Sequence, residues 1–197
     1  MNKIETTYSW FVAVVTPNTE VKCKERLRDL IKVLSKNNII DSTEKVTSYV
    51  PTQKVFRVQP STGRRVRITE VLTPCYLFIR CTDATRYQLA CKAKFILHFL
   101  MNRASMTDSG RNDFARIPAH QMESFMRMVE EAEKSVVIDP KRIHLGDRVR
   151  ITKGRLAGLE GNISREPNGT TMLALRVDFL GYAKMECSTK ILELVKE

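Results

Sequence analysis

The sequence has few of the residues that mark disulfide scaffolds, metal sites or enzymes. Its 197 residues include five cysteines, an odd number, with no C-x-x-C pair. Neither a disulfide framework nor a structural zinc site is therefore expected. The patterns G-x-S-x-G, H-E-x-x-H and G-x-G-x-x-G are also absent. We predict no catalytic residues, no metal ligands and no cofactor, and so no enzyme.

Long apolar runs and targeting patterns are missing as well. The sequence has no run of 18 apolar residues, which excludes a predicted transmembrane helix. Residues 1–10 do not show the pattern of a signal peptide. We therefore expect a cytoplasmic protein without a membrane partner.

Acidic residues are in the minority. The chain has 33 Lys and Arg against 22 Asp and Glu, a net charge of +11, and a hydrophobic fraction of 43% that is sufficient for folded cores. A polyanionic partner is one interpretation of this charge. A basic surface kept for solubility is an equally good one from composition alone.

Strand-like and helix-like segments alternate along the first 130 residues. Residues 10–15 form a short apolar run typical of a buried strand, as do residues 76–79. Residues 19–37 and 119–133 carry apolar side chains at three- and four-residue spacing, which predicts two amphipathic helices. The polar residues 102–113 are predicted to form a loop.

Two alternating segments, 54–58 and 65–71, flank the turn-forming residues 60–63 and predict a β-hairpin. Its arms and tip are basic, and four arginines are candidates for neutralising phosphates: Arg57, Arg64, Arg65 and Arg67. A solvated edge that resists strand pairing is an equally good interpretation of these charges.

The pattern changes near residue 134. Residues 134–142 have no period and are predicted to be a linker, whereas residues 143–197 contain five short strand-like segments typical of a small barrel. The expected division is one domain over 1–133, the linker over 134–142, and a second domain over 143–197.

Residues 146–163, GDRVRITKGRLAGLEGNI, resemble a KOW motif. Val149 and Ile151 alternate into the predicted core, and Gly154 and Gly158 allow tight backbone turns between strands. The resemblance implies an SH3-like barrel, which occurs in ribosomal proteins as well as in transcription factors.

The N-terminal part contains, in this order, Trp10-Phe-Val-Ala-Val, an amphipathic helix, Tyr49-Val-Pro-Thr, a basic hairpin and Leu72-Thr-Pro-Cys-Tyr-Leu-Phe-Ile79. This order resembles that of the NusG family, which includes the paralog RfaH. It implies an α+β protein, with an N-terminal α/β sandwich around a mostly antiparallel sheet and a C-terminal KOW barrel. Such a factor acts in transcription elongation or antitermination, as a monomer that binds the clamp of bacterial RNA polymerase.

Five residues are implied by this resemblance to contact the polymerase. In the family a Pro-Gly-Tyr or Pro-Asn-Tyr turn opens the strand that lines the polymerase-binding cavity, and Cys75 departs from that pattern. The implied contacts are Val12, Val14, Pro74, Tyr76 and Phe78. Ordinary core packing is the alternative interpretation for Tyr76 and Phe78.

The resemblance also implies contacts with nucleic acid and with a further protein. Arg26 matches a helix position that contacts the non-template strand in RfaH, and the hairpin arginines lie where the upstream fork would pass. In the barrel, Leu156 and Leu159 match the loop that contacts a small-subunit ribosomal protein or the termination factor Rho. We expect one leucine to point outward and the other inward.

Housekeeping members usually carry Phe-Phe-Pro-Gly-Tyr where this chain has Leu72-Thr-Pro-Cys-Tyr76. The departure favours a specialised paralog similar to the UpxY-type antiterminators or RfaH, which implies a long polysaccharide operon as the target. The alternative is a ribosomal or RNA-binding KOW protein.

Overall fold

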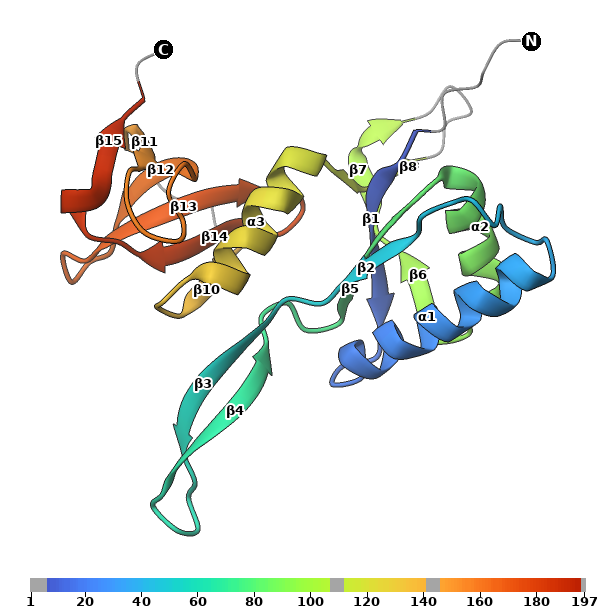
Figure 1. The fold of residues 1–197 in the computed structure, drawn as a ribbon, viewed down its shortest axis with the longest axis horizontal. Coiled ribbons are helices and arrows are strands. Elements are labelled where there is room, and N and C mark those ends of the chain that lie inside the picture. The colour runs from blue at the N-terminus through green and yellow to red at the C-terminus, as the bar shows by residue number, and fades with distance from the viewer. Residues whose placement is uncertain (1–6, 107–111, 141–145, 196–197) are drawn as a thin grey trace. The chain divides into compact units, whose positions relative to one another are not determined.

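The chain folds into two compact units, which are described separately (Figure 1). The computed structural model describes residues 7–106, 112–140 and 146–195. The first unit contains the residues up to Val50 together with Thr73–Ala119, and the second contains Pro51–Leu72 and the chain from His120 onward. Within the described residues, none of the helices is both long and apolar enough to span a membrane.

The first unit is built on an antiparallel sheet with the strand order β2-β5-β1-β6, and β9 also pairs with β1. Its strands are β1 (Ser9–Val15), β2 (Thr47–Tyr49), β5 (Tyr76–Cys81), β6 (Ile96–Phe99) and β9 (Arg116–Ile117). Helices α1 (Glu20–Lys36) and α2 (Asp83–Lys92) cover one face of the sheet (Figure 1). Both apolar runs predicted to be strands, 10–15 and 76–79, are confirmed.

The apolar face of α1 explains its position. Cys23, Leu27 and Leu34 recur at helical spacing and are buried, as are Phe11 and Leu77 of the sheet. Burying such an amphipathic face supplies most of the stability of a helix in a protein. The helix predicted over residues 19–37 is confirmed.

The predicted loop over residues 102–113 is wrong in part. Strands β7 (Met101–Met106) and β8 (Asn112–Phe114) pair antiparallel, with Met101 opposite Phe114 and Asn102 opposite Asp113. Residues 107–111 of the predicted loop lie outside the described part of the chain. The sequence did not predict these strands, because their residues are polar and lack the apolar alternation of a typical strand. Backbone hydrogen bonds to a partner strand can nevertheless hold a polar segment in a sheet.

The second unit contains the predicted basic hairpin, a helix and a β-rich domain. The hairpin consists of β3 (Thr52–Val58) and β4 (Arg65–Val71), and the helix is α3 (Ala119–Glu131). The six-stranded antiparallel sheet has the order β10-β14-β13-β12-β11-β15. Its strands are β10 (Val136–Asp139), β11 (Arg148–Ile151), β12 (Glu160–Arg165), β13 (Thr171–Val177), β14 (Gly181–Glu186) and β15 (Leu192–Leu194).

This β-rich sheet is compatible with the expected KOW-type barrel, and the α+β fold class is confirmed. Val149 and Ile151 are buried as the alternation of β11 predicts, and Gly154 and Gly158 have φ angles of +85° and +86°. Those angles lie in the left-handed region that side chains with a Cβ rarely adopt.

The predicted linker over residues 134–142 contains strand β10, so that prediction is wrong for its central part. Val136 lies opposite Met185 and Asp139 lies opposite Tyr182 of β14. The side chain of Lys184 also binds Asp139 at 2.8 Å. Residues 141–142 lie outside the described chain, and the predicted boundary between the domains stays a prediction.

Candidate functional site

A tight turn sets the start of β5, where the candidate polymerase contacts begin. The amide of Tyr76 donates to the carbonyl of Thr73 at 3.2 Å, with Pro74 and Cys75 between them. The φ angle of Cys75 is +70°. A proline followed by a residue with positive φ defines a type II turn, which normally has glycine or asparagine where this chain has Cys75.

A buried carboxylate holds this turn. Glu20, at the start of α1, is 2% exposed and accepts hydrogen bonds from the amide of Cys75 at 2.7 Å and from the amide of Asn18 at 3.2 Å. On the other side of the turn, the amide of Val15 donates to the carbonyl of Cys75 at 2.8 Å. These three hydrogen bonds hold Cys75 in a backbone conformation that usually requires glycine.

Strand register places four of the five candidate polymerase contacts on one face of the sheet. Val12 lies opposite Phe78, and Val14 lies opposite Tyr76. Directly opposed residues in an antiparallel pair point to the same face, as do residues two apart in a strand. Pro74 is exposed in the turn itself.

The members of this group differ in exposure. Phe78 and Val12 are 0% exposed, whereas Val14 and Tyr76 keep part of their surface exposed. Tyr49 of β2 lies opposite Phe78 and His98 of β6 lies opposite Val14, so both extend the same face. Neither residue was predicted from the sequence, because only the pairing register shows that they share this face.

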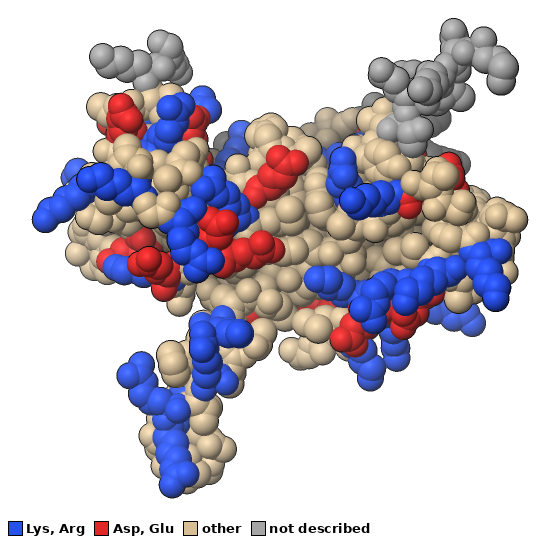
Figure 2. All heavy atoms as spheres, in the orientation of Figure 1, with Lys and Arg blue, Asp and Glu red and all other residues tan. Residues whose placement is uncertain are grey.

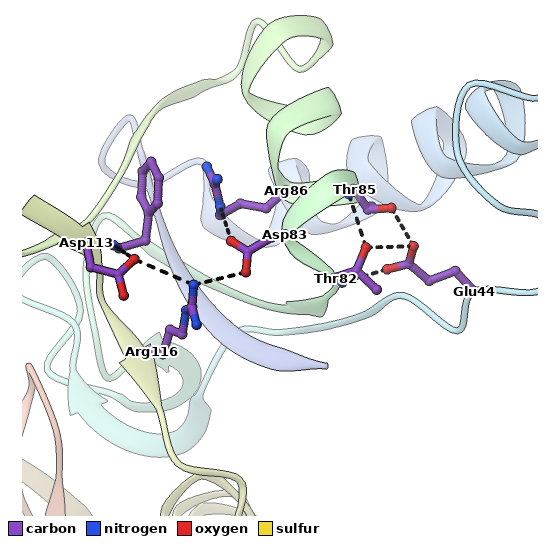
Figure 3. Close-up of polar contacts among 8 residues, drawn as sticks. Glu44, Thr82, Asp83, Thr85, Arg86, Asp113 and Arg116 are labelled. Atoms are coloured by element: carbon purple, nitrogen blue, oxygen red, sulfur yellow. Dashed lines mark hydrogen bonds and ion pairs between the residues drawn. The ribbon is translucent and has the colours of Figure 1, made fainter. Parts of the chain in front are cut away.

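A polar network joins α2 to neighbouring segments of the first unit (Figure 3). The carboxylate of Glu44 accepts from the amide of Thr82, the N-cap residue of α2, at 2.7 Å and from the hydroxyl of Thr85, in its first turn, at 2.5 Å. Asp83 binds Arg86 at 3.2 Å and Arg116 at 2.9 Å. The network therefore caps α2 and fixes the strand that carries Arg116.

The same region encloses a cation among aromatic rings. The guanidinium of Arg86 lies 3.5 Å from the ring centroid of Phe114, 5.6 Å from that of Phe11 and 5.8 Å from that of Phe99. Nearby, burial and the charge of Glu44 raise the pKa of the Cys81 thiol to about 12. Because the charged groups of this region form ion pairs with one another, we interpret the arrangement as structural. Among the described residues there is no group of side chains that could hold a metal ion.

Basic side chains gather along α1 and on the hairpin (Figure 2). Arg26 is exposed and lines a shallow depression with Lys92 and Lys94, next to Leu30 and Phe95. Of these three basic residues, Arg26 alone was predicted from the sequence. The pair Lys92-Ala-Lys94 at the end of α2 was visible as a local charge cluster, but only the fold brings it beside α1.

The four candidate arginines of the hairpin do not form one surface. Arg65 and Arg67 lie opposite Val58 and Phe56 and share a face with them, whereas Arg57 points to the other face. Arg57 binds Glu70 of β4 at 2.6 Å. Arg64 is exposed in the turn.

The KOW loop differs from expectation in one respect. Leu156 is 7% exposed and Leu159 is 3% exposed, so the prediction that one of them points outward is wrong. The amide of Gly158 donates to the carbonyl of Ile151 at 2.7 Å, which folds the loop back onto the barrel and buries both side chains. Arg155 and Ala157 are exposed instead.

Arg127 of α3 attaches this loop to the helix. Its guanidinium donates to the carbonyl oxygens of Arg155 at 2.9 Å and Ala157 at 2.7 Å. It also binds Glu131 one turn further along α3 at 3.4 Å. The loop backbone is thereby held by a charged group from outside the barrel.

Comparison with known proteins gives a family match over residues 8–138, to the family described as "Transcription termination factor nusG". Among solved structures, one described as "Domain interaction in Thermotoga maritima NusG" is 16% identical, covers 96% of this chain and 98% of its own, and superimposes with a TM-score of 0.48. Two structures of an MjSpt4:Spt5 complex, in conformations A and B, are 10% and 11% identical with TM-scores of 0.30 and 0.31. They cover 95% of this chain, and 99% and 97% of their own.

No curated protein matches the chain. The family match covers well over half of the 197 residues and includes β1, the hairpin, β5 and α3. These are the elements that carry the turn at Cys75, the face around Tyr76 and the basic hairpin. The chain therefore belongs to the NusG family of transcription factors.

Proposed function

We propose that this chain is a transcription elongation or antitermination factor that binds the clamp of bacterial RNA polymerase and reduces pausing or termination. It acts by binding one conformation of the polymerase more tightly than others, which shifts the population toward that conformation without catalysis. In this proposal residues 1–133 form the polymerase-binding domain and residues 143–197 form the KOW barrel. Strand β10, which lies in the predicted linker over residues 134–142, pairs with β14 of the barrel.

The observation that carries the proposal is the position of Tyr76. The type II turn at Pro74 and Cys75 places it at the first position of β5, opposite Val14, and the residue is partly exposed. A partly exposed aromatic residue is typical of a binding hot spot. Phe78 and Val12 support it from the same face of the sheet.

Retention of purified bacterial RNA polymerase by the immobilised full-length chain tests this proposal. Substituting Tyr76→Ala is expected to weaken retention by about 10-fold or more, as for other hot-spot aromatics. Tyr87→Ala is the matched control, because Tyr87 is a tyrosine on α2 with 61% of its surface exposed. Phe78→Ala is less informative, since removing a buried ring is expected to destabilise the fold.

Two outcomes would contradict the proposal. One is equal retention of polymerase by wild type and by Tyr76→Ala. The other is retention of ribosomal subunits without polymerase, which would favour the ribosomal or RNA-binding KOW protein that the barrel alone also allows.

Nucleic acid would be a secondary partner of the complex. Arg26, with Lys92 and Lys94, forms a basic depression suited to the non-template strand, and Arg64, Arg65 and Arg67 of the hairpin suit the upstream fork. Such contacts position the protein without reading sequence. Because Arg57 is paired with Glu70, it is the weakest of the predicted phosphate contacts.

The exposed part of the KOW loop around Arg155 and Ala157 would contact a small-subunit ribosomal protein or Rho. The departure from Phe-Phe-Pro-Gly-Tyr at residues 72–76 supports a specialised paralog of the UpxY or RfaH kind, acting on a long polysaccharide operon. Deleting the gene should then lower the transcripts of distal genes in such an operon more than those of promoter-proximal genes. An equal effect on both would contradict the paralog assignment.

A further inference from the structure

The β3–β4 hairpin has two chemically different faces. Directly opposed pairs include Phe56 with Arg67, Val58 with Arg65 and Lys54 with Thr69, and these six residues share one face. The opposite face carries Val55, Val66 and Ile68 together with the Arg57–Glu70 ion pair. We call the face with Phe56 the aromatic face.

The aromatic face exposes large apolar groups between cations. Phe56 is 62% exposed and Val58 is 61% exposed. The guanidinium of Arg65 lies 5.6 Å from the centroid of the Phe56 ring, within the range of a cation–π contact. Glu70 is the acidic residue of the two strands and points to the other face, so the charges that β3 and β4 place around Phe56 are positive. Further from the ring, Lys54 and Arg67 line a pocket that Glu130 of α3 and Glu133 also line.

We propose that the aromatic face binds single-stranded nucleic acid, with an unpaired base stacked on Phe56 and the neighbouring phosphates bound by Arg65 and Arg67. Base stacking on an aromatic ring beside a basic track is how proteins bind single strands without sequence preference. In a duplex both faces of each base are covered by its neighbours, so Phe56 has nothing to stack on. The cations Lys54, Arg65 and Arg67 beside the ring suit a polyanion, because backbone phosphates can neutralise them.

This inference deepens the proposed function, because it specifies unpaired rather than duplex nucleic acid as the ligand of the hairpin. The binding itself does not require polymerase. It is therefore measurable with the purified full-length chain alone, and separately from the polymerase retention described above.

Fluorescence anisotropy with labelled DNA tests the preference. The full-length chain is expected to bind an oligothymidylate of about 12 nucleotides, long enough for several bases to reach a binding site, more tightly than a duplex of the same length. Phe56→Ala should weaken single-strand binding by about 5- to 100-fold and leave duplex binding unchanged, since one stacked base is worth roughly that factor. Val66→Ala, an apolar truncation on the opposite face of the hairpin, should change neither.

A charge variant separates stacking from electrostatics. Arg67→Gln should weaken binding to both forms of DNA and reduce the magnitude of the salt-dependence slope for the single strand by about 0.7, the value for one phosphate contact. Arg165→Gln removes one exposed charge from the barrel as the matched control. It should leave single-strand affinity at the wild-type value.

A tryptophan variant reports stacking directly. The single native tryptophan, Trp10, is 5% exposed and is expected to be insensitive to DNA. Phe56→Trp should keep the wild-type affinity, and its added fluorescence should be quenched when the oligothymidylate binds, because the indole stacks on a base.

Equal single-strand affinity of wild type and Phe56→Ala would overturn the inference, as would equal affinity for duplex or unquenched fluorescence of the tryptophan variant. Polymerase retention distinguishes this failure from that of the proposed function. Phe56→Ala should be retained like wild type, whereas Tyr76→Ala should be retained poorly and still bind the oligothymidylate.

Discussion

The backbone amide of Cys75 donates a hydrogen bond of 2.7 Å to the carboxylate of Glu20, which lies 55 residues earlier in the chain. Glu20 is 2% exposed and stands in the first turn of α1, where the helix dipole favours a negative charge. The contact ties the start of α1 to the turn that precedes Tyr76. It explains how a cysteine is held at a φ of +70° in a position that usually requires glycine.

Replacing Cys75 with glycine should stabilise the protein, because glycine adopts positive φ without the steric penalty of a Cβ. The expected gain is about 1 kcal/mol in the free energy of unfolding, measured by urea denaturation. Cys75→Ala is the control for loss of the thiol and should give no such gain. A glycine variant no more stable than the alanine variant would contradict the assignment of strain to this turn.

The barrel should lose stability at alkaline pH through Lys184. Burial opposes the charge of this side chain, but hydrogen bonds to Asp139 and Glu166 outweigh it and raise its pKa above the ordinary 10.5. A group whose pKa is raised by folding stabilises the protein fully below the unfolded value. That contribution is lost as pH rises through the folded value, so urea midpoints should fall above about pH 10.5.

Lys184→Met tests the same pair of contacts at neutral pH. It leaves the carboxylates at 2.8 Å and 2.7 Å without their cation and should cost about 2–3 kcal/mol, since a buried ion pair is broken from one side. Lys134→Met, which breaks an exposed pair with Glu186, should cost less than about 1 kcal/mol. Equal costs for the two variants would contradict the structural role of Lys184.

The five cysteines, which carry free thiols, should react in order of their exposure. Cys91 is exposed and should be alkylated first in the native protein, whereas Cys81 is 0% exposed with its thiol pKa raised by burial to about 12. Because the thiolate is the reactive form, Cys81 should react only on unfolding. Peptide mass spectrometry after timed treatment with iodoacetamide gives the order.

Substituting Leu156 or Leu159 should lower the stability of the protein, because both side chains are buried and not exposed to a partner of the KOW loop. Truncating either buried leucine to alanine is expected to cost about 2–4 kcal/mol, measured by urea denaturation. Arg155→Ala, on the exposed side of the same loop, should cost less than about 0.5 kcal/mol. A cost near zero for both leucine variants would show that these side chains lie outside the core.

Arg127→Ala should loosen the KOW loop specifically. Its guanidinium binds the carbonyls of Arg155 and Ala157, and a charge-assisted hydrogen bond to an exposed backbone group contributes about 1 kcal/mol. Hydrogen exchange should rise at the amides of residues 154–158 and stay unchanged in β13. Unchanged exchange in the loop would show that the helix does not hold it.

The local sequence pattern was sufficient to predict the elements whose structure depends mainly on residues close together in the sequence. The apolar spacing of Cys23, Leu27 and Leu34 predicted α1, and strict alternation predicted β3 and β4. The glycines at 154 and 158 predicted the turns of the KOW loop. Each of these features depends on side chains close together in sequence.

Pairing with distant residues decided what the pattern missed. Residues 134–142 appeared aperiodic, but Val136 pairs with Met185 and Asp139 with Tyr182 of β14. Strands β7 and β8 are likewise held by backbone pairing between polar segments. The orientation of the hairpin arginines likewise depended on register, because a shift of one residue exchanges the two faces.

By itself the sequence determined the family and the positions of the basic hairpin and the Pro74–Tyr76 turn. Tertiary structure alone decided that Glu20 holds Cys75, that both KOW leucines are buried, and that Arg57 is separated from Arg65 and Arg67. The reason is physical. Helical and alternating patterns depend on residues that are close together in the sequence. Burial, ion pairing and strand register depend on which distant segments of the chain come into contact.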